Sequence, residues 1–517
     1  MANKTVFAST RGRLVPKADA VNAEGARAYA YAPEHQLAQL AMTGTVGQLF
    51  YATPELELAT AVRLAEAVEP EFLAQAAIHA RTAGHMKDMP AVLLAVLARV
   101  DPVLFRQAFG RVVDNGKMLR TFVQVMRSGQ TGRKSLGTRP KALVADWLNT
   151  ASDRAILQAN IGNDPSLADV IRMVHPKPAS PTREALFAWI VGKPCDATLL
   201  PQVVQDWLVF KKTGQGKVPD VPFQMLTQLP LDQRQWTKIA ERGSWQMVRQ
   251  NLNTFQRHGV FDRPKVVHKV AAKLRDKARI EKARVLPYQL MVAAKAASDA
   301  LPAEIRAALH DAMEVAVANV PVFEGRVAVC PDVSGSMTWP VTGWRKGAST
   351  TVRFVDVAAL VAAAVLRRNP TAQVLPFDHG VHRLRLEPRD TVQTNAERLA
   401  AIGGGGTNCS APLRWLEAHD QAPDLVILVS DNQSWADQAQ GRGTAMMKEW
   451  TLLKRMNPRA KLVCVDIAPY GTTQAAERPD VLNVGGFSDA VFEQIAAFAT
   501  DRMGPAHWVG AIKKVRL

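Results

Sequence analysis

The spacing of apolar residues changes near Val320, and this change constrains the fold more than any other feature of the chain. In residues 55–320 apolar side chains recur every three or four residues, which is typical of amphipathic helices. After that point, short runs rich in β-branched residues alternate with helical stretches. A chain of 517 residues is long enough for roughly two to four domains. The change therefore predicts a multidomain protein, with an all-α unit over residues 1–320 and an α/β unit over residues 321–517.

The first unit is predicted to be a stack of helix pairs. Its helical segments are roughly 10–15 residues long, often begin near a proline and often end at a glycine or an asparagine. The clearest segments are residues 70–84, 90–100, 102–116 and 141–151. Such lengths with short connections favour antiparallel pairs in a solenoid-like arrangement, although the sequence has no strict period.

The second unit is predicted to be a doubly wound parallel sheet. Near-continuous apolar strands that alternate with helices are typical of a sheet with both faces covered. The strands are expected at residues 326–330, 372–377, 424–430 and 461–467. The helices are expected at residues 352–368, 443–456 and 489–501. In such sheets the functional loops lie at the carboxyl ends of the strands.

Three of these strand-end loops carry hydroxyl or carboxylate side chains. The loop CPDVSGSMTW begins at Cys330, GGGGTN spans residues 403–408, and SDNQSW spans residues 430–435. All candidate ligands are hard oxygen donors, which suit Mg²⁺ or Mn²⁺ and suit zinc poorly. They are Asp332, Ser334, Ser336, Thr407 and Asp431. Gly335 would allow a tight turn, and glycines 403–406 would allow close backbone approach.

Other interpretations of these loops explain less of the pattern. A Ser/Gly turn with helix-capping hydroxyls accounts for DVSGS but not for Thr407 and Asp431. A phosphate-binding role for the glycines lacks the GxxxxGK[ST] and GxGxxG patterns. Catalytic motifs such as HExxH and GxSxG are missing from the sequence, as is a paired acid and base near the loops. A metal with an open position therefore favours capture of an outside carboxylate over cleavage of a substrate.

The net charge of +17 lies almost entirely in the first unit. Residues 321–517 contain 22 Lys and Arg against 19 Asp and Glu, a net charge of +3, which leaves +14 for residues 1–320. A basic domain joined to a nearly neutral one indicates a polyanionic partner for the first. The alternative is a basic surface that serves solubility alone.

Cations concentrate in three places. Residues 127–141 contain no acid, and in residues 264–284 four lysines recur every four residues, which on a helix forms one basic stripe. With few acids at the neighbouring i,i+4 positions, such a stripe suits a phosphate backbone. Each place alone could equally be a solvated face. The cations are Arg127, Arg133, Lys134, Arg139 and Lys141, then Lys265, Lys269, Lys273 and Lys277, and in the N-terminal arm Arg11, Arg13 and Lys17.

For the remaining candidate RNA contacts, an ordinary structural role is an alternative to RNA binding. His175 and Lys177 follow a helix that ends before a proline, where His175 could simply cap the helix. The aromatic residues Trp236, Trp245 and Phe255 have helical spacing and are expected in the core. An aromatic content of 6% also argues against recognition by base stacking alone.

No apolar run is long enough for a membrane span, and the N-terminus does not resemble a signal peptide, so a cytoplasmic protein is expected. The four cysteines are scattered without zinc spacing, which predicts reduced thiols.

With its helical unit followed by the α/β unit, the whole chain resembles the Ro ribonucleoprotein family, most closely its bacterial branch. The resemblance implies a TROVE domain over residues 1–320, an irregular ring of HEAT-like helix pairs. It implies a von Willebrand factor A domain over residues 321–517, a Rossmann-like unit with a metal-ion-dependent adhesion site. The segments that carry the likeness are residues 28–52, 118–149, 171–178, 245–261, 283–297, 332–337, 403–415 and 428–436.

The resemblance also implies a function. Family members bind small noncoding Y RNAs on the basic outer face of the ring and capture loose ends of misfolded RNA in its central hole. Bacterial relatives act in RNA quality control and can tether the exoribonuclease polynucleotide phosphorylase. The expected protein is a monomeric ring with no enzymatic activity. Carried over by motif, the RNA contacts are Arg133, Lys134, Arg139, Lys141, His175 and Lys177, and the metal ligands are the five oxygen donors named above.

The chain departs from the family pattern at the metal loops. Many relatives have Thr-Asp after the glycines and Thr-Asp-Asn-Glu at the third loop, where this chain has Thr407-Asn408 and the stretch 430–433, SDNQ. Two missing acids would lower metal affinity or change the ligand. Residues 338–350 are hypothesised to form a rim near the metal. The rival functions are a protein-interaction scaffold that captures a partner carboxylate, and a metal-dependent nuclease.

Overall fold

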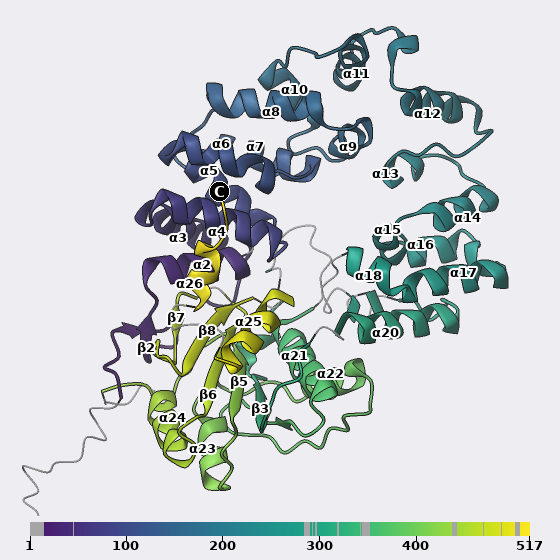
Figure 1. The fold of residues 1–517 in the computed structure, drawn as a ribbon. Helices are drawn as coiled ribbons and strands as arrows, with labels where there is room; N and C mark the ends of the chain where they lie inside the picture. The colour runs from purple at the N-terminus through teal and green to yellow at the C-terminus, as the bar shows by residue number, and fades with distance from the viewer. Residues whose placement is uncertain are drawn as a thin grey trace, which may run out of the picture.

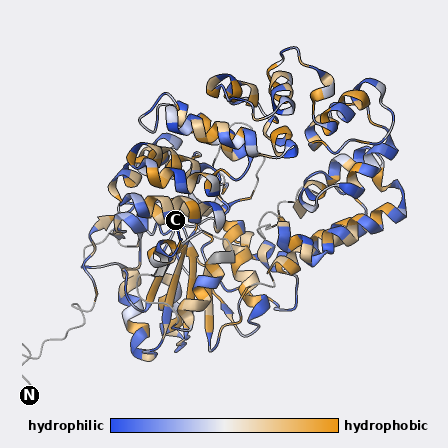
Figure 2. Ribbon diagram, turned by 45° about the horizontal axis from the view of Figure 1, so that its top comes forward, coloured by the Kyte–Doolittle hydropathy of each residue, from blue (hydrophilic) through white to orange (hydrophobic). Residues whose placement is uncertain are grey.

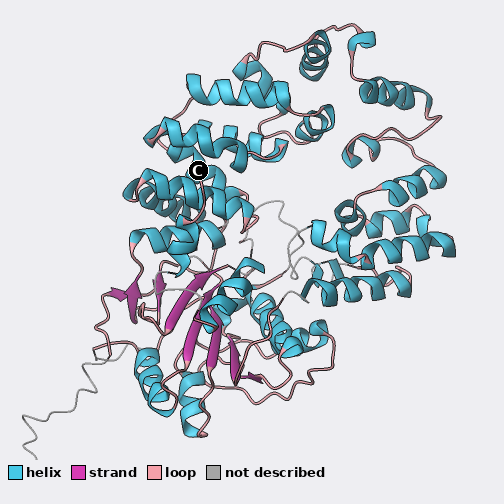
Figure 3. Cartoon of the chain, viewed as in Figure 1, coloured by secondary structure: helices cyan, strands magenta, loops and turns pink. Residues whose placement is uncertain are grey.

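The computed structural model describes residues 15–517 except 45, 284–289, 292, 295–296, 318–319, 342, 344–351, 437–441, 469, 487–488 and 502–506. Helices occupy the first three-fifths of the chain and follow one another around a ring-like arc (Figures 1 and 3). The described strands lie in the last two-fifths of the chain, at the base of this arc, except for two short strands within residues 20–30. The change of pattern near Val320 therefore marks the change of architecture.

Several helices of the arc begin where the sequence provides a proline. α4 (Pro70–Thr82), α6 (Pro102–Val112) and α11 (Pro181–Val191) each have proline in the first turn. The remaining helices are α2 (Pro33–Thr43), α3 (Pro54–Ala67), α5 (Asp88–Val100), α7 (Gly116–Arg127), α8 (Thr138–Thr150), α9 (Asp153–Ala159), α10 (Leu167–Val174), α12 (Gln202–Thr213), α13 (Phe223–Leu226), α14 (Gln233–Arg242), α15 (Trp245–Gln250), α16 (Leu252–Arg257), α17 (Pro264–Arg275), α18 (Lys277–Ala283) and α20 (Ala303–Val317).

The first half of the arc is a solenoid. Helix α4 contacts both α5 and α6, and the same pattern continues from α5 to α7, from α6 to α8, from α7 to α9 and from α8 to α10. Each helix thus packs against the helix two places further along the chain, as in HEAT-like repeats. The prediction of stacked helix pairs is confirmed.

The second unit contains a five-stranded parallel sheet in the order β4-β3-β5-β6-β8. Its side chains alternate between two apolar clusters: Ile427 and Val429 of β5 face one, and Val426 and Leu428 face the other. Figure 2 shows these strands as hydrophobic ribbons in the middle of the unit. The strands are β3 (Val327–Pro331), β4 (Gln373–Val374), β5 (Leu425–Ser430), β6 (Lys461–Asp466) and β8 (Val481–Gly485).

Helices cover both faces of this sheet. α21 (Phe354–Arg368) packs against β3 and β5 with α22 (Val392–Ala400) beside it. Side chains of α23 (Ala411–Ala418) and α24 (Ala445–Met456) belong to the cluster on the opposite face. The doubly wound sheet is confirmed, with two differences: the second predicted strand, residues 372–377, forms only two residues of strand, and β8 was not predicted.

The two units meet at both ends of the arc. At one end α2 packs against β8, and at the other α20 packs against α22, so the helical arc closes on the sheet unit (Figure 1). The last helices are α25 (Asp489–Ala499) and α26 (His507–Lys513), and α26 contacts α4 and α2. Both ends of the described chain therefore pack across the predicted boundary at residue 320. None of the described helices is long and apolar enough to cross a bilayer.

Candidate metal edge and basic surfaces

The first loop follows β3 and is held by its own aspartate. The Oδ1 of Asp332 accepts a hydrogen bond from the backbone N of Ser334 at 2.9 Å, which turns the chain back on itself. Its Oδ2 accepts from the hydroxyl of Ser430 on β5 at 2.5 Å. The hydroxyls of Ser334 and Ser336 lie 3.4 Å apart. The residues at alternate positions therefore do converge, as the sequence predicts.

The glycine loop lies directly along the first loop. The backbone N of Gly335 donates to the carbonyl of Gly405 at 2.8 Å, and that of Gly404 donates to Val333 at 3.0 Å. At Gly404 φ is +117°, a conformation that favours glycine. The predicted close backbone approach is confirmed. This contact places Thr407, which is 4% exposed, at the same edge of the sheet.

The third loop completes the set. Asp431 follows β5, is 1% exposed and is hydrogen-bonded by the Ser336 side chain. The backbone N of Trp435 donates to the carbonyl of Thr407 at 3.0 Å, which joins the second and third loops. The structure thus brings all five predicted oxygen donors together at the carboxyl end of the sheet, here named the metal edge: Asp332, Ser334, Ser336, Thr407 and Asp431.

The metal edge is a buried concentration of negative charge. Burial and the neighbouring Asp431 raise the pKa of Asp332 to about 7, and burial also raises the pKa of Asp431. Neither carboxylate has a lysine or arginine partner among the described residues. Two buried carboxylates side by side are costly unless a positive charge accompanies them. Their oxygens, with the three hydroxyls, fit a hard divalent cation.

Such an ion would depend on hydroxyl ligands. In the described part of the chain, no three His, Cys, Asp or Glu side chains are grouped so that they could hold a metal. The amides of Asn408 and Gln433, where the resemblance leads one to expect acids, add no carboxylate to this set. Asn408 instead accepts hydrogen bonds from Ser410, and Gln433 donates to the carbonyl of Asp431 at 3.2 Å.

A third carboxylate, Asp466, was missed in the sequence. It ends β6, is 1% exposed, and has a pKa raised mainly by burial and further by Asp431. Asn432 lies beside it, 1% exposed, with neither amide atom in a hydrogen bond of good geometry. The sequence held a signal for it, since Asp466 is an acid at the carboxyl end of the predicted strand 461–467, the same edge of the sheet as Asp332 and Asp431.

The helical unit covers the metal edge. Residues 20–30, here named the N-terminal strap, comprise β1 (Ala20–Val21), a turn, and β2 (Arg27–Ala30), which pairs with β7 (Thr472–Thr473) of the second unit. The side-chain N of Asn22 donates to the carbonyl of Ser434 at 2.7 Å. The backbone N of Ala23 donates to the Oε1 of Gln433 at 2.8 Å. The strap is therefore bound directly to the third loop.

Aromatic side chains from both units surround the same edge. Phe50 packs edge-on against Trp339 at 5.7 Å, and Tyr51 packs edge-on against Tyr470 at 5.2 Å between ring centres. Trp339 is the one described aromatic of the hypothesised rim, residues 338–350. Trp344, Arg345 and Lys346 lie outside the described residues.

The basic cluster at residues 127–141 is open to solvent. It occupies the turn between α7 and α8 and the first turn of α8. Lys134, Arg139 and Lys141 are exposed, and Arg133 is partly exposed. Within the described residues none of these four cations forms an ion pair. They form the basic cluster referred to below.

The prediction that residues 264–284 present a continuous stripe of unpaired lysines is wrong, because three of the four lysines have partners. Lys269 pairs with Glu241 of α14 at 3.1 Å. Lys273 donates to the carbonyls of Ala240, Glu241 and Gly243 at 2.7–3.1 Å, and burial lowers its pKa. Lys277 lies on α18, beyond the end of α17, and pairs with Glu281 at 3.8 Å.

Only Lys265 of the four is exposed without an ion pair in the described residues. The sequence pattern failed because the partners of Lys269 and Lys273 come from the neighbouring helix α14 and its end, whereas Lys277 pairs within its own helix.

The other RNA candidates lie in different places. His175 is exposed and ends α10 in a left-handed conformation, with φ of 50°, so it does cap that helix. Lys177 is exposed, and its carbonyl accepts from the side chain of Asn149 on α8 at 3.0 Å. Both therefore lie near the far end of the helix whose start bears the basic cluster. Arg11 and Arg13 lie outside the described residues.

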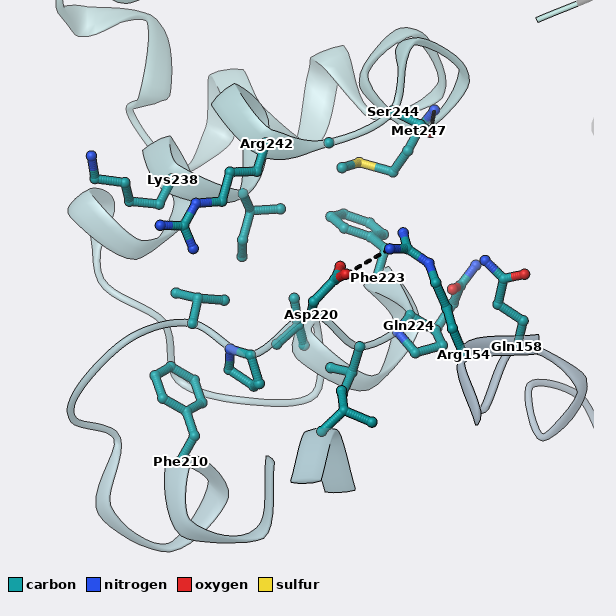
Figure 4. A pocket seen from close by; sticks show the side chains of 18 of the residues that line it. Arg154, Gln158, Phe210, Asp220, Phe223, Gln224, Lys238, Arg242, Ser244 and Met247 are labelled. Atoms are coloured by element: carbon teal, nitrogen blue, oxygen red, sulfur yellow. Dashed lines mark hydrogen bonds and ion pairs between the residues drawn. The ribbon is translucent and has the colours of Figure 1, made fainter. Parts of the chain in front are cut away.

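A pocket with a volume of about 1280 Å³ opens between α9, α12, α13, α14 and α15. Its walls mix cations with amides and apolar groups, and Arg154 pairs with Asp220 across it at 2.6 Å (Figure 4). Trp236, Trp245 and Phe255 are at most 4% exposed, so their expected place in the core is confirmed. The cations that line the pocket are Lys117, Arg120, Arg154, Lys217, Lys238 and Arg242.

Comparison with known proteins agrees with this arrangement. Residues 326–499 match the family model described as the Ro60 vWA domain. The second unit is thus similar to the Ro60 vWA domain over most of its length. The predicted resemblance of the whole chain to the bacterial Ro family is also confirmed, because the relatives of the Ro type match far beyond this domain.

Two Ro relatives are similar over long stretches. "RNA-binding protein RO60" of Deinococcus radiodurans is 24% identical over 357 residues, which cover 65% of this chain and 66% of that protein. The protein of the same name from Caenorhabditis elegans is 23% identical over 268 residues, 50% of this chain and 40% of that protein. The matched part thus spans less than two thirds of either relative.

The Ro fold extends over nearly the whole chain. The crystal structure of the Deinococcus radiodurans RO (RSR) protein superposes with a TM-score of 0.60 at 21% identity. The match covers 91% of this chain and all of that one. The fold class predicted from the sequence, a helical-repeat ring followed by a von Willebrand A domain, is therefore confirmed.

Proposed function

We propose that the chain is a non-enzymatic, monomeric RNA-binding protein that binds structured, Y-like RNA and the free ends of misfolded RNA. The observation that carries the proposal is the basic cluster, four cations that no described acid neutralises on a unit of net charge +14. Cations without intramolecular partners are available to phosphates and release counterions when RNA binds. The relatives named as RNA-binding proteins support the same assignment.

We assign different parts of an RNA to different surfaces. The basic cluster with His175 and Lys177 suits the phosphate backbone of a folded RNA, which proteins recognise by shape and charge. The pocket suits a single-stranded end, since its cations can bind phosphates while the partly exposed Phe223 and several amides can contact unstacked bases. A role in RNA quality control, and a partnership with an exoribonuclease, belong to the same proposal.

The metal edge is proposed to hold Mg²⁺ or Mn²⁺. Asp332 and Asp431 would supply the charge, and Ser334, Ser336 and Thr407 neutral oxygens. An ion held there would act by its charge and would attract a further oxygen ligand. The alternative function, capture of a partner protein's carboxylate at this edge, is less well supported, because the strap covers it. A cytoplasmic location stays a prediction.

The proposal is tested by binding of a structured RNA with a single-stranded 3′ tail at two salt concentrations. We expect affinity to fall steeply with salt, and the double variant Lys134→Glu, Arg139→Glu to reduce the salt slope by about 2, about 1 for each lost phosphate contact. The control is Lys448→Glu, an exposed lysine of the second unit without an ion pair in the described residues. Affinity that ignores salt, or that the double variant leaves unchanged, contradicts the proposal.

A second pair of variants tests the pocket. Lys117 and Lys217 line it, are exposed and form no ion pair among the described residues. We expect Lys117→Glu with Lys217→Glu to weaken binding of the tailed RNA by more than tenfold and to affect the same RNA without its tail much less. If the two RNAs lost the same amount of affinity, the pocket would not be the binding site of the single-stranded tail.

A further inference from the structure

The segment that joins β4 to α22 presents a row of arginines on the second unit. Exposed and partly buried side chains alternate along it from residue 383 to residue 389. Leu384 and Leu386 are among the partly buried ones and pack against the apolar cluster on the α21 face of the sheet. The alternation therefore turns the intervening side chains outward. The three arginines among them are here named the basic row: Arg383, Arg385 and Arg389.

Local acids do not neutralise the basic row. None of its three arginines forms an ion pair within the described part of the chain. Glu387 is also exposed, and its carboxylate accepts a hydrogen bond from the backbone N of Arg389 at 3.4 Å. The next acid, Asp390, pairs with Arg398 of α22 at 3.0 Å. Residues 379–389 thus contain three arginines against one glutamate, a local charge of +2 in a unit whose net charge is only +3.

The start of this segment is fixed by a buried carboxylate. Asp378 is 3% exposed, and its Oδ1 accepts a hydrogen bond from the backbone N of Gly380 at 3.2 Å. The same oxygen lies 2.9 Å from a ring nitrogen of both His379 and His382. The backbone N of His382 donates to the carbonyl of Pro376 at 2.8 Å. The chain therefore enters the basic row from a turn of defined shape.

The far end of the segment is fastened where the arc meets the sheet unit. The guanidinium of Arg367 on α21 donates to the carbonyls of Pro388 and Arg389 at 3.2 Å each. It also pairs with Glu314 of α20 at 3.2 Å. A segment that lacks regular secondary structure but is held at both ends presents its side chains in preset positions. Less conformational entropy is then lost when these side chains bind a partner.

The chemistry of the basic row suits the phosphate groups of a nucleic acid. Guanidinium groups bind phosphate oxygens through two parallel hydrogen bonds, and cations without acid partners release counterions from a polyanion. We propose that the basic row is a second RNA-binding surface, which contacts the phosphate backbone of RNA from the second unit. The inference rests on the proposed function and extends it from the helical unit to the α/β unit.

The basic row and the basic cluster lie in different parts of the molecule. The row precedes α22 at the base of the arc, whereas the cluster lies between α7 and α8 in its upper part (Figure 1). An RNA that contacts both must extend from the helical unit to the sheet unit. The two surfaces therefore contribute separately to its affinity.

The test measures binding of the tailed RNA, with its stem lengthened to extend across the molecule, to the full chain at about 50 and 200 mM salt. The variant Arg383→Gln with Arg385→Gln removes two cations and leaves the basic cluster and the pocket unchanged. We expect the salt slope to fall by about 2, about 1 for each lost phosphate contact. The rise in salt should then cost the wild-type chain about tenfold more affinity than it costs the variant.

The matched control is Lys448→Gln with Arg455→Gln. Both residues are exposed on α24, which covers the opposite face of the sheet, and neither forms an ion pair in the described residues. The control removes the same charge from the same unit and should leave the salt slope unchanged. Equal effects in the two double variants would mean that the net charge of the unit matters and its position does not, which would overturn the inference.

A further variant combines the changes in the basic row with Lys134→Glu and Arg139→Glu in the basic cluster. The two reductions in salt slope should add to about 4, because distant sites that share no partner contribute independently. Hydrogen exchange of residues 379–390 should slow when RNA is added to the wild-type chain, and also when it is added to the variant of the basic cluster alone.

The outcomes distinguish this inference from the proposed function. Wild-type affinity and salt slope in Arg383→Gln with Arg385→Gln would overturn the role of the basic row and leave RNA binding through the basic cluster standing. Failure of the wild-type chain to bind RNA would overturn the proposed function and the inference together.

Discussion

Lys273 illustrates how a cation that looks available in the sequence can serve the structure instead. Its ammonium donates to three carbonyls at the end of α14, groups that the helix itself leaves without partners. A positive charge also interacts favourably with the carboxyl end of a helix dipole. Lys273 is therefore a capping residue between two helices.

Replacement of Lys273 should affect stability more than RNA binding. We expect Lys273→Ala to lower the free energy of unfolding by about 2 kcal/mol, because it leaves partly buried carbonyls without a charged donor. Lys265→Ala on the same helix is the control and should change stability by less than about 0.5 kcal/mol. Urea denaturation measures both. Equal stability of the two variants would show that the capping bonds contribute nothing.

His79 predicts how stability depends on pH. Burial in α4 lowers its pKa to about 4 from the ordinary value of 6.5, so the folded chain resists a proton that the unfolded chain accepts. The contribution of the neutral ring is fully present above pH 6.5 and is lost as the pH falls towards 4, by about 3 kcal/mol. We expect His79→Gln to flatten the stability profile in this window, measured by denaturation at pH 7 and pH 4.5. An unchanged profile would exclude His79 as the cause.

At the level of elements, the strands and strand-end loops that follow from the local spacing of apolar residues could be predicted from the sequence. The strands β3, β5 and β6 were found because buried parallel strands are continuously apolar, and their loops converge because the strands are parallel. The metal edge followed from this rule alone. β8 was missed, since Asn483 interrupts its apolar run, and Asp466 was overlooked although it obeys the same rule.

Contacts between distant elements could not be predicted in this way. The neutralising partner of Lys269, Glu241, lies 28 residues away on another helix, where an i,i+4 count does not reach. The bond from Asn22 to Ser434 joins residues 412 positions apart. No periodicity encodes such pairs, because they depend on how whole helices and the sheet pack.

The contact between α2 and β8 is predicted to be sensitive to volume. A Cβ at Gly485 would lie 1.8 Å from the Oε1 of Gln39 and 3.2 Å from its Cα. We expect Gly485→Val to lower the free energy of unfolding by about 1–3 kcal/mol through overpacking, measured by urea denaturation. The control is Gly110→Ala in α6, where a Cβ meets nothing within 4 Å and should stabilise the helix slightly. A neutral Gly485→Val would mean that the two elements separate easily.

At the scale of the whole molecule, the C-terminal residues fasten the sheet unit to the start of the arc. Lys513 of α26 pairs with Glu34 of α2 at 2.7 Å. The side-chain N of Gln75 on α4 donates to the carbonyls of Lys513 at 3.1 Å and Val515 at 3.2 Å. These bonds add to the packing of α26 on both helices.

Removal of residues 507–517 should therefore loosen the closed ring. We expect a lower melting temperature and a larger radius of gyration in small-angle X-ray scattering, since the arc loses one of its attachments to the sheet unit. Lys514→Glu on the intact chain is the control, because Lys514 is exposed and forms no ion pair in the described residues. If the truncated chain kept the radius of gyration of the intact chain, the other contacts between the two units, such as those of α2 with β8 and of α20 with α22, would be sufficient to close the ring.

The position of the N-terminal strap also has a consequence for how the molecule is made. The ribosome produces residues 20–30 before the third loop to which they bind, and that loop follows more than 400 residues later. Until then the helical unit has no sheet unit to pack against, and contacts between residues so distant in sequence form slowly. The strap therefore cannot dock on the third loop until both units of the chain have been synthesised.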